Sequence, residues 1–289
     1  MDMFSFLVQT LNAMQYGLLL FLVASGLTLV FGIMGIINLA HGSFYMAGAY
    51  LAFGLTSATG SFLWSIMLGV PLAMLIGAAL EALLIVHLYK RDHLEQVLLT
   101  YGLILIFEEL RSILVGDDVH GVPMPDFLTG SIPLNDTLSY PIYRLAISLV
   151  CVALAAGLYM LIQRTRLGMM IRAGSHDRDM VQALGINIKM IYRLVFALGV
   201  GMAALAGMLA APISSVAPNM GGSVLILSFV VVVIGGIGSV WGALIGALLI
   251  GFADTFGKVI LPQFAGVMVY LVMAAVLLWR PEGLLKKGV

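Results

Sequence analysis

Two short stretches of polar residues and glycines interrupt apolar sequence and could contact a solute inside a membrane. The candidate path-lining residues are Asn38, His41, Gly42 and Ser43 in the first stretch, and Gly235, Gly236, Gly238 and Ser239 in the second. Lipid cannot satisfy the backbone of a broken helix, so such a break is tolerated only where protein covers it or where it lines a cavity. Broken helices at membrane depth commonly surround the substrate path of a transporter. The pattern therefore predicts a translocation path.

The lengths of the flanking segments favour breaks inside the membrane. The apolar segment 223–234 is too short for a helix that crosses a hydrocarbon core of roughly 30 Å, so the second break is expected at membrane depth. Two alternatives remain open. Asn38 and His41 could form an interfacial turn at the end of an ordinary helix, and the glycines could simply allow close helix packing. Gly242 and Gly246, which are four residues apart, fit the packing alternative.

The segment 164–193 is the longest strongly charged interruption of the apolar sequence. Its charged residues are the cations Arg164, Arg166, Arg172, Arg178, Lys189 and Arg193 and the anions Asp177 and Asp179. Gly174 and Ser175 precede a short run that has Asp177 and Asp179 in its first turn, and Gly185 follows this run. These start and stop signals predict a short helix over 176–184. Such a helix could dock on another protein, or the segment could be a solvated connector that only sets the orientation of the chain. The candidate docking residues are Arg172, His176, Asp177, Arg178, Asp179, Ala183, Leu184 and Gly185.

The composition is that of a membrane protein. The chain has 289 residues, of which 62% are hydrophobic and 10% are charged, and its mean hydropathy is +1.10. No soluble domain could cover its surface with so few polar groups. We predict an all-α polytopic membrane protein that forms a single transmembrane domain over 1–289. It should contain about eight to nine hydrophobic helical segments, some of them broken or half-spanning.

Charge asymmetry orients the chain in the lipid bilayer. All Lys and Arg residues except Arg111, Arg144 and Lys258 fall on one side of the predicted topology, and such an excess marks the cytoplasmic side. The loop 164–193 and the C-terminus are therefore predicted to be cytoplasmic. The N-terminus and the external loop 116–140, which has four Asp and no Lys or Arg, are predicted to be periplasmic.

Several function classes lack the residues that they need. Cys151 is the only cysteine, and no set of His, Asp and Glu residues has metal-ligand spacing, so we expect no metal, no cofactor and no enzyme activity. The chain has no phosphate-binding loop, so any ATP hydrolysis would take place in a separate subunit. A net charge of zero argues against nucleic acid as a partner.

A few charged residues lie within or near the predicted spans. Glu81 is expected to have a structural hydrogen-bonding role, because an unpaired carboxylate is costly in lipid. Glu108 and Arg111, three residues apart, are expected to pair, as are Asp254 and Lys258, four residues apart. The alternative function is an ion-coupled secondary transporter for a small polar metabolite, which would use Glu81 or Asp254 as an ion site.

Four segments together carry a resemblance to one family. They are NLAHGSFYMAGAY at 38–50, RTRLGMMIRAGSHDRDMVQALGIN at 164–187, VIGGIGSVWGALIG at 233–246 and LLWRPEGLL at 277–285. In this order and spacing they resemble the LivH-type inner-membrane permease subunit of branched-chain amino acid ABC importers. The residues that match the family's cytoplasmic and glycine motifs are Arg172, Ala173, Ala183, Gly185, Ile186, Asn187, Gly235, Gly236, Gly238 and Gly242.

The resemblance implies a transport complex in a bacterial inner (plasma) membrane. Its expected partners are a second permease of the LivM type, two cytoplasmic ABC ATPase subunits and a periplasmic amino-acid-binding protein. The helix predicted over 176–184 resembles the coupling helix that seats in a groove of the ATPase. The implied substrate is a branched-chain or related hydrophobic or aromatic amino acid. The family also includes importers of urea and short amides, which remain alternatives.

Overall fold

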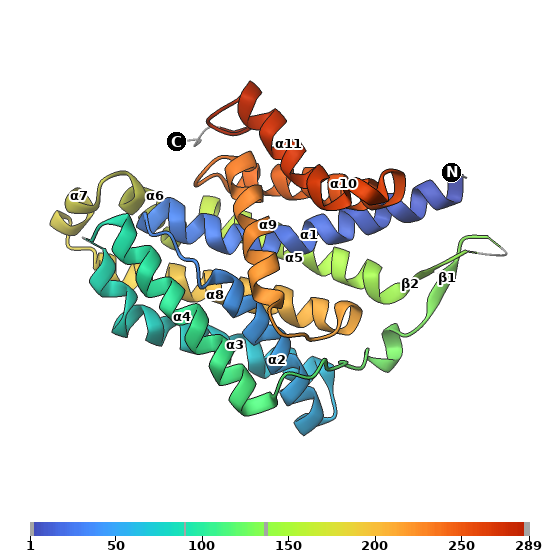
Figure 1. Ribbon diagram of the computed structural model, residues 1–289. Coiled ribbons are helices and arrows are strands. Elements are labelled where there is room, and N and C mark those ends of the chain that lie inside the picture. The colour runs from blue at the N-terminus through green and yellow to red at the C-terminus, as the bar shows by residue number, and fades with distance from the viewer. Residues whose placement is uncertain (1–2, 90, 136–137, 286–289) are drawn as a thin grey trace.

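The computed structural model describes residues 3–89, 91–135 and 138–285 and shows a bundle of helices (Figure 1). Within these ranges, six helical units are long and apolar enough to span a membrane. They are α1 (Met3–Met34), α3 (Phe62–Leu83), α5 (Ile142–Arg164), α8 (Ile188–Ser214), α10 (Val240–Ile260) and Pro262–Trp279, which joins η3 (Pro262–Phe264) to α11 (Ala265–Trp279). The predicted all-α polytopic class is confirmed.

The remaining elements are shorter or more polar. They are α2 (His41–Thr59), η1 (Ile85–Leu88), α4 (His93–Val115), η2 (Asp126–Leu128), β1 (Ser131–Pro133), β2 (Ser139–Pro141), α6 (Arg166–His176), α7 (Arg178–Ala183) and α9 (Met220–Gly235). The two strands form an antiparallel hairpin in which Ile132 lies opposite Tyr140. The hairpin and the α6–α7 segment lie at opposite ends of the bundle (Figure 1). We call these the hairpin end and the loop end.

Two helices form the buried centre. Of the most apolar stretch of each helix, 89% is buried in α1 and 78% in α8, against 6% in Pro262–Trp279. α1 and α8 meet at glycines, because a Cβ on Gly26 would come within 2.6 Å of the Gly199 carbonyl oxygen. Small residues promote association in lipid by letting backbones approach closely. The outer helices α3, α4, α5 and α11 expose many large apolar side chains, as a lipid-facing surface should.

The short helix α9 lies across the bundle instead of along it (Figure 1). Its first turn packs against the start of α2, where a Cβ on Gly42 would overlap the Gly221 carbonyl oxygen. Its last residue packs against α10, where a Cβ on Gly242 would overlap the Gly235 carbonyl oxygen. Gly246 makes a similar close contact with α9. The packing role of Gly242 and Gly246 is therefore confirmed.

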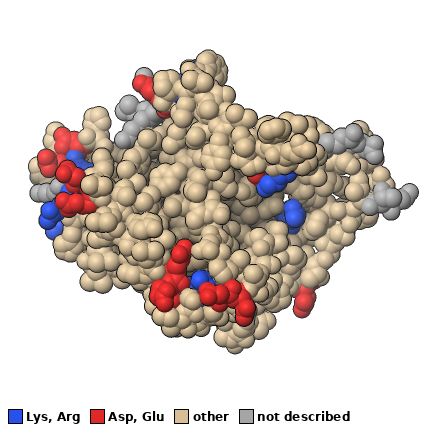
Figure 2. All heavy atoms as spheres, in the orientation of Figure 1, with Lys and Arg blue, Asp and Glu red and all other residues tan. Residues whose placement is uncertain are grey.

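Charged side chains gather over α7 and the start of α4 at the loop end, and again around the C-terminal end of α4 (Figure 2). The predicted pair of Glu108 and Arg111 is wrong. Arg111 instead pairs with Asp117 at 2.8 Å, because α4 ends at Val115 and the chain turns back at Gly116 (φ 90°). The hydrogen bond from Arg111 lowers the pKa of the Asp117 carboxyl.

Asp254 and Lys258 are paired as expected, and Glu81 is hydrogen-bonded as expected. Lys258 Nζ lies 2.5 Å from Asp254 Oδ2. Glu81 is fully buried, accepts from Arg193 Nε at 2.9 Å and also accepts from the Tyr89 hydroxyl. The structural role predicted for Glu81 is confirmed, and Arg193 of the charged segment is the partner that neutralises it.

The charged segment forms two helices where one was predicted over 176–184. Gly174 and Ser175 lie inside α6, and the Ser175 hydroxyl donates to the Arg172 carbonyl oxygen at 2.8 Å. Asp177 ends α6 and caps α7, because its Oδ1 accepts from the Met180 N–H at 2.9 Å. α7 therefore starts at Arg178, after the predicted start. The predicted stop is correct, since α7 ends just before Gly185, whose φ is 82°.

Candidate translocation site

The first break separates α1 from α2 at residues 35–40. Gly35, which follows the last residue of α1, has a left-handed conformation (φ 69°) that glycine adopts without strain. The chain then returns along α1, because His41 Nε2 lies 3.0 Å from the Val23 carbonyl oxygen, well inside that helix. A carbonyl only accepts, so Nε2 carries the hydrogen and donates it. α2 therefore begins inside the bundle, and His41, Gly42 and Ser43 form its first turn instead of part of the break.

The first break holds buried polar atoms without hydrogen-bond partners. Asn38 and His41 are 0% exposed. Among the described residues, neither amide atom of Asn38 has a partner, nor has His41 Nδ1 or Thr28 Oγ1. An unsatisfied buried group costs about 1–3 kcal/mol, and native proteins keep few of them. Asn38 and His41 are thus buried in the bundle and not solvated, and they carry polar atoms without partners.

The second break lies at residues 236–239, between α9 and α10. Gly236 and Gly238 have φ values of 99° and 81°, which only glycine adopts readily. Ser239 then starts α10, because its hydroxyl oxygen accepts from the Gly242 N–H at 3.0 Å. The predicted break is therefore confirmed, and its glycines serve the turn and its serine serves as a helix cap.

The segment after α11 covers the second break, whose position at membrane depth stays a prediction. The Leu284 N–H donates to the Ile234 carbonyl oxygen at 2.8 Å, and the Leu285 N–H donates to that of Gly235 at 3.2 Å. α9 starts inside the bundle, beside Gly42. Its C-terminal end is buried as well, since Ile234 is 0% exposed.

The two predicted sets of path residues do not form one site. α9 separates them, since Gly42 contacts its first turn and Gly235 is its last residue. The second break packs instead on α1, where a Cβ on Gly32 would lie 2.6 Å from Gly238 Cα. Because α1 ends at Met34, the second break lies beside the point where the chain enters the first break.

Most of the predicted docking residues lie on the surface of the loop end. The exposed ones are His176, Asp177, Asp179, Ala183, Leu184 and Gly185. Arg172 is only half-exposed, and its guanidinium donates to the Ile162 carbonyl oxygen near the end of α5. Arg172 therefore fastens α6 to α5 and is not part of the free surface.

Arg178 reaches from α7 into the bundle. Its Nη2 donates to the Met34 carbonyl oxygen at 2.6 Å, and its guanidinium carbon lies 5.5 Å from the centre of the Tyr192 ring. The last carbonyls of a helix lack partners within the helix and favour a cation. Arg178 therefore caps α1 directly before Gly35 and connects the charged loop to the first break.

Two cavities flank α1 at opposite ends. The loop-end cavity, about 510 Å³, lies between α1, α5, α6 and α10. Its wall includes the predicted path residues Gly238 and Ser239, together with Arg172 and Ser175 of α6. The hairpin-end cavity, about 480 Å³, is lined by α1 residues between Gln9 and Val23.

Similarity to known proteins matches this architecture. Residues 9–278 match the family described as branched-chain amino acid transport system / permease component. The chain belongs to this family. The high-affinity branched-chain amino acid permease proteins BraD of Pseudomonas aeruginosa and LivH of Escherichia coli are each 30% identical to it, covering 98% and 97% of this chain and 97% and 95% of their own length. LivM of Escherichia coli is 26% identical over 90% of this chain and 66% of LivM. The resemblance to LivH-type permeases is confirmed.

Two contacts of this permease component have no counterpart in the sequence predictions. Arg178 binds Met34, and Leu284 binds Ile234. Both contacts join segments that are far apart in the chain, which periodicity and composition do not report. Gly283 is a local sequence signal for the second contact. It has a positive φ (87°), and it packs against Gly236 of the second break.

Proposed function

We propose that this permease component forms half of the translocation path of an ATP-driven importer for branched-chain or related apolar amino acids. The similarity to BraD and LivH, which are described as branched-chain amino acid permeases, supports the substrate class. The observation that carries the mechanism is the contact between Arg178 of α7 and the Met34 carbonyl oxygen. It joins the charged loop to the break that holds Asn38 and leads into His41.

In this mechanism α7 acts as a lever that an ATPase moves. The exposed residues of the loop end form the docking surface. A rigid-body shift of α7 pulls Arg178 and the end of α1 with it, since packed helices move between discrete arrangements. The shift displaces residues 35–40 and changes the surroundings of the unpaired polar atoms on Asn38 and His41. Alternating exposure of these atoms would pass a solute from one end to the other.

The proposed complex contains a LivM-type permease, two cytoplasmic ABC ATPase subunits and a periplasmic amino-acid-binding protein. The similarity of the chain to both LivH and LivM supports a pair of related permeases. The chain has no phosphate-binding loop of its own, which supports separate ATPases. In a bacterial inner membrane, the loop end would face the cytoplasm and the hairpin end the periplasm, in agreement with the distribution of Lys and Arg.

The buried pairing of Glu81 disfavours the ion-coupled alternative. Glu81 is 0% exposed and is bound to Arg193 at 2.9 Å. A buried carboxylate that already holds a fixed cation is a poor site for a transported proton or sodium ion. Glu81 therefore does not supply the site that an ion-coupled transporter needs.

Reconstitution of the complete complex tests the function. In vesicles that contain both permeases and the ATPases, we expect L-leucine uptake that requires ATP and the binding protein. Excess isoleucine or valine should compete with leucine, whereas urea and acetamide should not. Uptake that follows a proton or sodium gradient without ATP would contradict the proposed mechanism, and uptake of urea or acetamide without leucine would contradict the substrate.

Cysteine labelling tests the orientation. In a Cys151→Ala background, Thr129→Cys should react with a membrane-impermeant thiol reagent from the periplasmic side, and Leu184→Cys should react from the cytoplasmic side. Both positions are exposed, and Cys151 is buried. The background protein without an added cysteine is the control and should stay unlabelled. Labelling of both positions from one side would show that the orientation is wrong.

A further inference from the structure

The hairpin-end cavity has the size and composition of a small-molecule site. Its volume of about 480 Å³ falls within the range of about 300–1,000 Å³ that is typical of such sites. The polar residues that matter in its wall are Asn12, Gln15, Tyr16, Arg144, Asp254 and Lys258. Toward the hairpin end, two basic patches, one with acidic atoms beside it, lie close together, and a separate acidic patch lies below them (Figure 2). The apolar side of the wall includes Leu19, Leu20, Val23, Ile213 and Val224.

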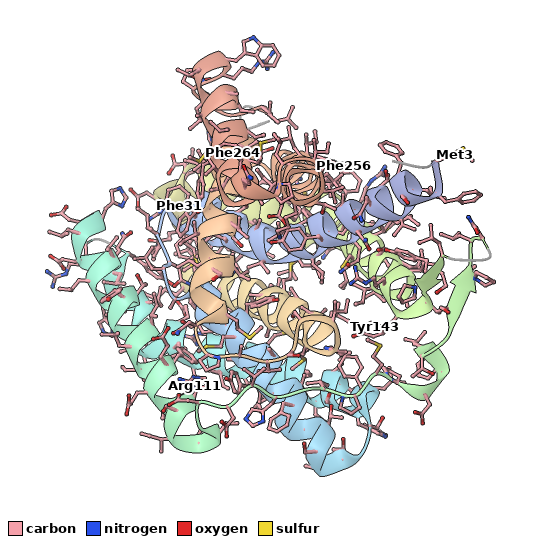
Figure 3. All side chains as sticks on the ribbon, turned by 45° about the vertical axis from the view of Figure 1, so that its right-hand side comes forward. Met3, Phe31, Arg111, Tyr143, Phe256 and Phe264 are labelled. Carbon is pink, nitrogen blue, oxygen red and sulfur yellow. The ribbon has the colours of Figure 1, made fainter. Side chains whose placement is uncertain are left out.

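Arg144 is a cation on an apolar helix that pairs with no carboxylate among the described residues. Its Nη1 donates to Asn12 Oδ1 at 2.8 Å, and a guanidinium has five N–H donors, so donors remain for an anion. The adjacent Tyr143 hydroxyl donates to the Leu209 carbonyl oxygen at 3.0 Å, which holds the first turn of α5 against α8 (Figure 3). Arg144 is therefore fixed in the cavity wall by its neighbour.

Asp254 supplies the opposite charge from α10. Its side chain is only 13% exposed, and its partner Lys258 is 61% exposed. Lys258 Nζ also lies 5.8 Å from the centre of the Tyr16 ring. Exposed ion pairs contribute little, typically about 0–1 kcal/mol, so a second ammonium group can displace Lys258 from the carboxylate.

The apolar base of the cavity adjoins the first break. Val23 lines the cavity, and its carbonyl oxygen accepts from His41 at the start of α2. Leu20 lies one helical turn nearer the hairpin end. The cavity therefore offers charged groups of both signs and an apolar surface that leads toward the proposed path.

We propose that the hairpin-end cavity is a binding site in the permease for a zwitterionic amino acid with an apolar side chain. Arg144 binds the carboxylate, Asp254 binds the ammonium group in place of Lys258, and the side chain lies toward Leu20 and Val23. This inference rests on the proposed function and adds a site at which the permease itself recognises both charges of its substrate.

The test measures binding of radiolabelled L-leucine to the complete permease–ATPase complex in nanodiscs, without the binding protein. Arg144→Gln and Asp254→Asn should each weaken leucine binding at least about tenfold, because each removes a charge-assisted hydrogen bond. Leucinol lacks the carboxylate and should compete poorly with leucine on the wild-type complex. The same holds for the keto acid of leucine, which lacks the ammonium group. Arg144→Gln should abolish the preference over leucinol, and Asp254→Asn the preference over the keto acid.

The matched controls are Arg91→Gln and Asp117→Asn, whose side chains lie outside the cavity and which should bind leucine as the wild type does. Arg144→Lys, which keeps a cation in place, should retain part of the preference over leucinol. Unchanged preferences in the two cavity variants would overturn the site, and so would an equal loss for leucine and both analogues. A wild-type complex that imports leucine but does not bind it here would refute the site alone, whereas absence of leucine import would refute the proposed function.

Discussion

Replacing Arg178 with glutamine is expected to lower ATP-driven amino acid uptake at least about tenfold while ATP hydrolysis and assembly of the complex continue. Arg178 donates to the Met34 carbonyl oxygen at 2.6 Å and lies over the Tyr192 ring. A hydrogen bond from a charged group contributes about 1.5–3 kcal/mol, and about 1.4 kcal/mol corresponds to a factor of ten. Without this bond, α7 moves with the ATPase but no longer moves α1. Uptake and hydrolysis measured in the same vesicles separate the two effects.

Two further variants define what Arg178 does. Arg91 is exposed and lies outside α7, so Arg91→Gln, the same substitution, serves as the control and should keep most of the uptake. Arg178→Lys keeps the charge but loses the planar guanidinium, and its uptake should fall between those of the wild type and Arg178→Gln. Wild-type uptake by Arg178→Gln would show that α7 does not act through α1. Loss of the ATPase from the purified complex would instead assign Arg178 to docking.

The variant Gly242→Ala should leave little assembled permease in the membrane. The added Cβ would overlap the Gly235 carbonyl oxygen, which is backbone and cannot rotate away. Overpacking a close contact costs about 1–3 kcal/mol, and more where the backbone must move, against a total stability of about 5–15 kcal/mol. The measurements are the yield of monodisperse complex after gel filtration and its thermal unfolding midpoint.

Gly157→Ala is the matched control for this substitution. Gly157 lies inside α5, and an added Cβ there would meet no atom within 4 Å. Alanine should be neutral at this position or stabilise the helix by about 0.5–1 kcal/mol. If Gly242→Ala accumulates and unfolds like Gly157→Ala, the close approach of α9 and α10 is not needed for folding.

Local features of the fold could be predicted because each depends on residues near one another in the chain. Polar residues and glycines in apolar surroundings indicated both breaks. Lipid offers no hydrogen-bond partners to an open backbone, so a break must be covered by protein or line a cavity. Gly185 indicated the end of α7, because glycine readily adopts the left-handed conformation that follows a helix, and Gly185 has it (φ 82°). The pairing of Asp254 and Lys258 followed from helical spacing. Hydropathy gave the class because the chain has too few polar residues to cover a soluble surface.

The arrangement of the site could not be predicted, because the same local signal fits two structures. Ser175 suits the start of a helix, yet its hydroxyl binds a carbonyl oxygen within α6. Arg111 suits a pair with Glu108, yet the turn at Gly116 places Asp117 nearer. The length of α9 suggested a helix that ends partway through the membrane, but it did not reveal that the helix lies across the bundle. Such choices depend on contacts between distant segments.

The C-terminal end of α9 also depends on residues that the ribosome makes much later. The carbonyl oxygens of Ile234 and Gly235 belong to the last turn of the helix, which supplies them with no donors of its own. Their donors come from Leu284 and Leu285, beyond α10 and α11. During synthesis these carbonyls stay open until both later helices have entered the membrane and the chain has folded back. The end of α9 is therefore completed only by a segment that follows two further helices in the chain.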